Sequence, residues 1–209
     1  MDNKNLISFI KIIILKISPG TDIFVIDNKY ISPKPTVMSL EEKQGFLKNN
    51  FIIKDRNGIE CFKCEKGKTI TSSKNGEPLL ILKEGNLSSY MKIVGGNNKN
   101  KVIATINTKD SVAEEKYKVT YFNQASEREE ILEMNCDATY RSCGIFYGKE
   151  NEGAPLICKI IEMKSKSFFS NKTNYTIEIA SGVDNLFMTS LAICLTEMKE
   201  QYQMNLNDD

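Results

Sequence analysis

One stretch near the C-terminus constrains the fold of this chain more than any other: residues 183 to about 202 have the pattern of a single helix that is apolar on nearly every side. From Leu186 to Leu195 only Thr189 and Ser190 are polar, and charge returns at Glu197. A helix without a polar face is surrounded either by lipid or by protein. The apolar part, roughly 10 to 13 residues, covers only about 15–20 Å, too short for a bilayer core of about 30 Å. We therefore expect protein to enclose this helix.

The start and the core face of the helix can also be predicted. Ser181, followed three residues later by Asp184, resembles a capping box in which Asp replaces Glu. The helix is therefore expected to begin at about Val183, and the polar residues 205–209 to form a frayed tail. The side chains expected to build the core are Leu186, Phe187, Leu191, Ile193 and Leu195.

The rest of the chain has the pattern of short β-strands separated by turns. Asn57-Gly58 and Asn75-Gly76 each lie between two apolar runs, which is typical of a hairpin turn. Between residues 116 and 122 apolar and polar side chains alternate, as in a strand with one buried face. This spacing indicates one β-sandwich or barrel that encloses the helix. The predicted strands are 23–26, 36–40, 51–53, 59–64, 69–71, 79–82, 90–94, 102–106, 116–122, 131–136, 143–147, 156–163 and 175–179.

The composition excludes several classes of function. The chain has 209 residues, no histidine and a net charge of +1. Without imidazole, Ser-His-Asp and Cys-His catalysis and histidine-containing zinc sites are impossible, although carboxylate and Lys chemistry remain open. Proteins that bind nucleic acid electrostatically carry a larger basic excess. We expect no catalytic residue, no cofactor, no metal site and no nucleic-acid partner.

The six cysteines are expected to be reduced. Disulfide-rich scaffolds are usually much shorter chains, whereas this one can bury its own core, and Cys194 lies within the apolar helix. Disulfides in a secreted protein are the alternative. Cys61 and Cys64 have the spacing of a redox or metal-binding pair, but in a strand residues i and i+3 face opposite sides, which favours a structural role.

The N-terminal residues 6–17 form a short apolar run that includes Lys11 and Lys16. Three interpretations remain open: a strand or segment docked on the domain, a membrane-surface anchor, or a cleaved signal. The domain organisation is therefore predicted as an apolar N-terminal segment (1–20), one barrel domain (21–204) and a polar tail (205–209).

Four segments, taken in order, resemble proteins of the LURP-one-related family: residues 50–65, 74–82, 140–147 and 179–184 with the helix that follows. The resemblance covers roughly residues 23 to 203. It implies a tubby-like fold, which is a closed antiparallel barrel of about twelve strands around an apolar C-terminal helix. Tubby proteins, which bind phosphoinositides, and phospholipid scramblases share this fold. The chain lacks the cysteine cluster of scramblases, and only Asp184 is acidic where they bind calcium, so calcium-dependent scrambling is not expected.

Two groups of lysines are candidates for contact with a lipid headgroup, and a solvated surface is the alternative for both. Arg141 is expected to pair with a carboxylate near one end of the barrel. The first group precedes the last strand and the second follows the first hairpin: Lys159, Lys164, Lys166 and Lys172; and Lys63, Lys66 and Lys68.

The sequence therefore predicts a non-enzymatic intracellular module of the LURP-one-related type. We expect a monomer without a transmembrane span, cytoplasmic or peripheral to a membrane. Its predicted partner is an anionic membrane lipid such as a phosphoinositide, bound through a Lys-rich outer face, or an unidentified protein. The alternatives are a scramblase-like membrane-associated protein and an enzyme that uses carboxylate or Lys chemistry.

Overall fold

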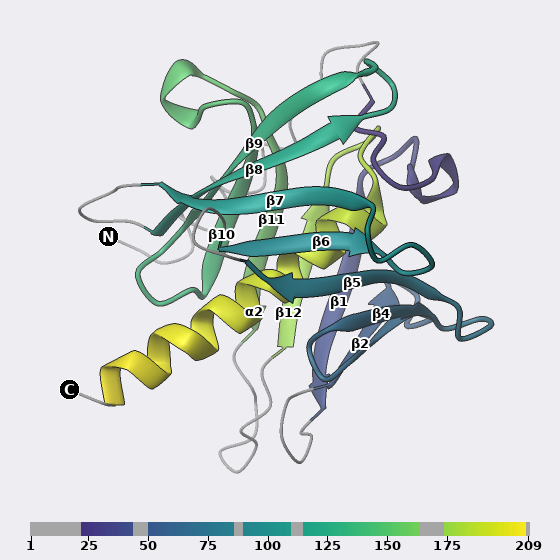
Figure 1. Ribbon diagram of the computed structural model, residues 1–209, viewed down its shortest axis with the longest axis horizontal. Helices are drawn as coiled ribbons and strands as arrows, with labels where there is room; N and C mark the ends of the chain where they lie inside the picture. Colours follow the sequence, from purple (N-terminus) through teal and green to yellow (C-terminus); the bar gives the residue numbers. More distant parts are fainter. Residues whose placement is uncertain (1–21, 44–49, 86–89, 110–114, 164–173, 208–209) are drawn as a thin grey trace.

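Twelve antiparallel strands form a closed barrel around one long helix in the computed structural model, which describes residues 22–43, 50–85, 90–109, 115–163 and 174–207 (Figure 1). The predicted β-barrel with a C-terminal helix is thereby confirmed. The elements are η1 (Asn28–Tyr30), β1 (Thr36–Lys43), β2 (Asn50–Asp55), β3 (Glu60–Glu65), β4 (Thr69–Ser72), β5 (Pro78–Glu84), β6 (Met91–Gly95), β7 (Val102–Lys109), β8 (Glu115–Asn123), β9 (Arg128–Cys136), β10 (Ser142–Tyr147), η2 (Glu150–Glu152), β11 (Leu156–Met163), β12 (Asn174–Ile179) and α2 (Asn185–Asn207).

Each strand pairs with the next one in the chain, and β1 pairs with β12 to close the barrel. Antiparallel neighbours of this kind need only short connections. The two predicted Asn-Gly hairpins connect β2 to β3 and β4 to β5. Gly58 and Gly76 adopt φ values of +80° and +71°, which residues with a Cβ atom rarely adopt. Both Asn-Gly pairs therefore form hairpin turns, as predicted.

The helix α2 fills the barrel interior. The five predicted core side chains are all completely buried, as are their neighbours Met188, Ala192 and Cys194. In Figure 1, α2 (yellow) passes behind β5, β6 and β7 and extends toward the C-terminus. No helix in the described part of the chain combines the length and apolar character that a membrane crossing requires. The apolar side chains of α2 pack instead against the inward side chains of the strands.

The start of α2 differs from the prediction. The helix begins at Asn185, and Asp184 itself caps it, because its Oδ1 accepts the backbone N–H of Phe187 at 3.0 Å. Gly182 has a φ of +76°, which prevents the helix from extending back to Ser181. At its other end α2 continues to Asn207, beyond the predicted helix end at about residue 202 and into the predicted polar tail.

The prediction of a strand at residues 23–26 was also wrong. Because β1 and β12 already close the barrel, no strand edge is open to this segment. Ile23 instead forms a single parallel bridge with Val183, and the Phe24 N–H donates to Asn123 Oδ1 at 3.1 Å. The segment is still part of the core, since Ile23 and Val25 are buried. The predicted N-terminal segment, residues 1–20, lies outside the described residues.

Candidate functional site

The buried hydroxyl groups of α2 are not available to bind a ligand in the barrel interior, because each one donates a hydrogen bond to a backbone carbonyl of the same helix. Thr189 Oγ1 donates to the Asn185 carbonyl, Ser190 Oγ to the Phe187 carbonyl and Thr196 Oγ1 to that of Ile193, each at 2.7 Å. Such bonds to the preceding helical turn are a common way to bury Ser and Thr. Candidate sites therefore have to be sought on the outer face and at the ends of the barrel.

The cysteines are free thiols, and five of the six are buried. Cys61 and Cys64 lie on opposite faces of β3, as predicted, since Cys64 is buried and Cys61 is partly exposed. Burial raises the pKa of the Cys64 thiol to about 12, so it stays protonated at neutral pH and is a poor nucleophile or metal ligand. Within the described ranges, no group of three or more Cys, Asp or Glu is placed to hold a metal ion.

The predicted lysine groups lie on different parts of the barrel. Lys63 projects outward from β3 and lies 3.5 Å from Glu60, while Lys66 and Lys68 are exposed in the β3–β4 turn. Lys159 is partly buried on β11, and β12, β1 and β2 separate it from β3. The remaining predicted lysines lie outside the described residues: Lys164, Lys166 and Lys172.

Arg141 has the carboxylate partner that was predicted for it. Its Nε lies 3.7 Å from Glu162 Oε2, and the same oxygen accepts the Lys199 ammonium at 2.8 Å. The Arg141 side chain is largely exposed, so this ion pair adds little to stability. The arrangement supports a structural role at this end of the barrel.

The structure reveals a third set of lysines, which was not predicted from the sequence. Strand register places Lys83 of β5 opposite Lys92 of β6, and Lys92 opposite Thr105 of β7. The same row continues to Thr120 of β8 and Ile131 of β9. Four strand spacings make this row about 19 Å wide. In Figure 1 the strands β5, β6 and β7 cross the front of the barrel.

Two residues of β8 widen this row on the same outward face. Lys118 lies two residues before Thr120, and Phe122 lies two residues after it. Phe122 is 54% exposed and Ile131 is 40% exposed, so two large apolar side chains lie on the same outward face as the cations. We call the surface formed by Lys83, Lys92, Lys118, Phe122 and Ile131 the lysine face.

Glu133 of β9 lies opposite Lys118 in the strand register, but its carboxylate pairs with Lys109 instead. Across the described parts of the chain, none of the ion pairs involves Lys83, Lys92 or Lys118. Lys83 Nζ donates to the Lys99 carbonyl at 3.2 Å. Like charges directly opposite one another on paired strands are unfavourable. An anionic partner would relieve this repulsion.

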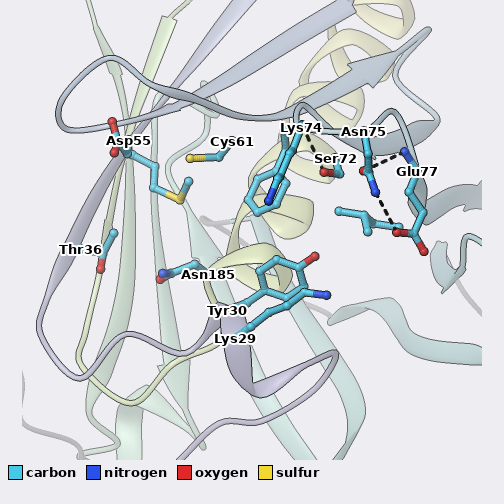
Figure 2. A pocket seen from close by; sticks show the side chains of 13 residues that line it. Lys29, Tyr30, Thr36, Asp55, Cys61, Ser72, Lys74, Asn75, Glu77 and Asn185 are labelled. Carbon is cyan, nitrogen blue, oxygen red and sulfur yellow. Dashed lines mark hydrogen bonds between the residues drawn. The ribbon is translucent and has the colours of Figure 1, made fainter.

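A cavity of about 520 Å³ opens at the end of the barrel where α2 begins. We call it the helix-end cavity. Its apolar lining includes Met38, Phe62 and Leu79. Figure 2 shows Lys29 and Tyr30 on one side of it and the β4–β5 turn on the facing side. The polar side chains around it include Lys29, Tyr30, Asp55, Lys74, Glu77 and Asn185.

A buried hydrogen-bond network anchors the segment that carries Lys29 and Tyr30. Asn123 Nδ2 donates to the Asp22 carbonyl at 3.0 Å and to Glu130 Oε2 at 2.8 Å. Burial raises the pKa of Glu130, but hydrogen bonds from Asn123, Ser126 and Arg128 outweigh it and hold the pKa at about 2. The carboxylate therefore stabilises the fold in its charged form.

This network predicts a loss of stability in acid. Because the pKa of Glu130 is depressed in the folded state, its contribution is present above the unfolded value of 4.5 and is lost as the pH falls toward about 2. Urea denaturation at pH 7 and pH 3 should show a smaller acid-induced loss in E130Q than in the wild type. E129Q, an exposed change on the same strand, should behave like the wild type. Equal acid sensitivity of E130Q and the wild type would exclude this role.

The amino-acid sequence was compared with known protein families, curated proteins and solved structures. The sequence matches the family model described as LURP-one-related over residues 36–196, from the first residue of β1 into α2. Protein LURP-one-related 15 of Arabidopsis thaliana is 24% identical over 190 residues, an alignment that covers 85% of this chain and 86% of that protein. No solved structure matches the chain.

Proposed function

This chain belongs to the LURP-one-related family, and from that premise we propose that it is a non-enzymatic binding module that docks on anionic membrane lipid through the lysine face. The observation that carries the proposal is the lysine face of β5 to β9, where three lysines that form no ion pair in the described residues share one outward surface with two exposed apolar side chains. Cations beside exposed apolar groups suit a membrane interface, where headgroups are anionic and the acyl boundary is apolar.

The electrostatic part of such binding has a predictable size. Each Lys near an anionic surface contributes about 1 kcal/mol, and salt screens this contribution. Phe122 and Ile131 would add apolar contacts that salt does not screen. A phosphoinositide is the headgroup to test first, because its phosphates offer several charges to Lys83, Lys92 and Lys118, and because the tubby-like resemblance points the same way. The anionic cytoplasmic leaflet would then be the site of action.

The alternatives receive less support. In a scramblase-like protein α2 would insert in lipid, but here residues 186–195 of this helix are completely buried within the protein. An enzyme would have to work without histidine, and the described thiols are mostly buried. These features favour a binding module whose ligand meets the outside of a rigid barrel.

Vesicle co-sedimentation tests the proposal. The wild type should bind phosphatidylcholine vesicles that contain phosphatidylinositol 4,5-bisphosphate or phosphatidylserine more tightly than vesicles of phosphatidylcholine alone. K83Q/K92Q/K118Q should weaken binding to the anionic vesicles at low salt by about 2–3 kcal/mol, or roughly 30- to 150-fold. F122S should reduce the binding that persists at high salt.

A matched variant distinguishes binding through the lysine face from a general effect of the protein's positive charge. K63Q/K66Q/K68Q removes the same charge from β3 and its turn, the second group predicted from the sequence, and should leave most of the binding intact. If this variant loses binding while K83Q/K92Q/K118Q keeps it, the lipid site lies on β3 instead. If the wild type does not distinguish anionic from neutral vesicles, the proposed function is wrong.

A further inference from the structure

We infer that the helix-end cavity is a second binding site, which takes a small organic monocarboxylate with an apolar ring and a hydroxyl group. Its volume of about 520 Å³ is typical of small-molecule sites. Met38, Phe62 and Leu79 provide apolar surface for a ring, and polar groups surround it. This site lies at the barrel end where α2 begins, and it shares no residue with the lysine face.

Lys74 is the group at the cavity that would bind a single negative charge on the ligand. Lys29 lies 3.0 Å from Asp27, so its charge is already paired. Lys74 has no ion pair in the described structure, and Figure 2 shows its side chain reaching into the cavity. Lys74 therefore offers one ammonium group to one carboxylate of a ligand.

Two acidic side chains at the cavity argue against a more highly charged ligand. Asp55 accepts the backbone N–H groups of Asn57 and Ile59 at 2.8 and 2.9 Å, and Glu77 accepts the Asn97 side-chain amide at 3.1 Å. Both carboxylates are therefore held in place by their own or neighbouring turns, and they would repel a phosphate dianion more strongly than a carboxylate. The lining thus favours a monocarboxylate over a phosphate ester.

The hydroxyl group is inferred from Asn185, the first residue of α2. Its Oδ1 is buried and has no hydrogen-bond partner among the described residues, and its side chain lines the cavity (Figure 2). A buried acceptor without a donor is unfavourable, so a ligand hydroxyl would be stabilised once the amide turns this covered oxygen toward the cavity. Lys74 and Asn185 would therefore hold the two polar ends of one ligand.

Three small probes test these features separately in titrations followed by two-dimensional amide NMR. 4-Hydroxyphenylacetate has the ring, the carboxylate and the hydroxyl; phenylacetate lacks the hydroxyl; tyramine replaces the carboxylate with an amine. We expect 4-hydroxyphenylacetate to shift the amide signals of Tyr30, Cys61 and Asn185 with a dissociation constant of about millimolar, as suits so small a probe. Phenylacetate should bind a few fold more weakly, and tyramine at least about tenfold more weakly.

Variants assign the contacts. K74Q should weaken 4-hydroxyphenylacetate about tenfold or more, and N185A should bring its affinity close to that of phenylacetate. K101Q, which removes an exposed charge at the same end of the barrel, and K83Q/K92Q/K118Q should both bind the probe like the wild type. The latter variant keeps this test independent of the lipid proposal. The inference is overturned if 4-hydroxyphenylacetate leaves the cavity signals unmoved, if tyramine binds equally well, or if K74Q has no effect.

Discussion

Replacing Phe187 with alanine is expected to lower the free energy of unfolding by about 4 kcal/mol. The side chain is completely buried on α2, and its ring centroid lies 5.3 Å from that of Tyr121 on β8. The substitution removes this contact and leaves a cavity in the middle of the barrel. Because the barrel is closed by twelve paired strands, the walls cannot collapse far onto the empty volume. Domains are typically stable by about 5–15 kcal/mol, so this is a large share of the total.

Urea denaturation followed by circular dichroism measures this loss. F187L, which keeps a large apolar side chain at this position, is the matched control and should cost about 1.5 kcal/mol, well below F187A. A loss below about 1 kcal/mol for F187A would mean that α2 is not packed tightly inside the barrel.

Replacing Asp184 with alanine is expected to cost about 3–4 kcal/mol. Its carboxylate joins two parts of the fold, since Oδ1 accepts the Phe187 N–H at 3.0 Å and Oδ2 accepts the Ile26 N–H at 2.8 Å. Alanine would remove the cap of α2 and leave the Ile26 donor without its acceptor. The same denaturation experiment measures the loss.

Two matched changes at this helix end sharpen the result. D184N keeps one acceptor oxygen and a good capping residue, so it should cost about half as much as D184A. S181A changes the residue that the sequence pattern identified as the cap, and it should cost less than about 0.5 kcal/mol. If S181A is as harmful as D184A, the helix is capped by Ser181 rather than by Asp184.

Local patterns in the sequence predicted the architecture well. The uniform apolarity of residues 186–195 was enough to predict an enclosed helix, because a side chain on any face of that stretch needs an apolar neighbour. Alternation in β8 and the two Asn-Gly turns likewise depend only on nearby residues. The capping residue was misassigned because Ser181 and Asp184 are both good caps. What separates them is the positive φ of Gly182, a property of the folded backbone.

The candidate sites could not be read from the sequence in the same way. The residues of the lysine face are spread from Lys83 to Ile131, and they come together only through the register of five strands. The lysine groups predicted from the sequence were chosen because their members are close along the chain. In a strand, however, successive side chains point to opposite faces, so closeness along the chain does not place them on one surface. The helix-end cavity combines Lys29, Lys74 and Asn185, whose proximity depends on closure of the whole barrel.

Site-specific fluorescence tests most directly whether the lysine face is the surface that meets lipid. In a C61S background, which removes the only partly exposed cysteine, single cysteines are introduced at Thr105 and at Ser39 and labelled with an environment-sensitive dye. Thr105 lies within the row on β7, and Ser39 faces outward on β1, six strands away in either direction round the barrel. With vesicles containing phosphatidylinositol 4,5-bisphosphate, the dye at position 105 should shift to shorter wavelengths and the dye at position 39 should not. A shift at position 39 alone, or at neither position, would contradict the proposed lipid-binding surface.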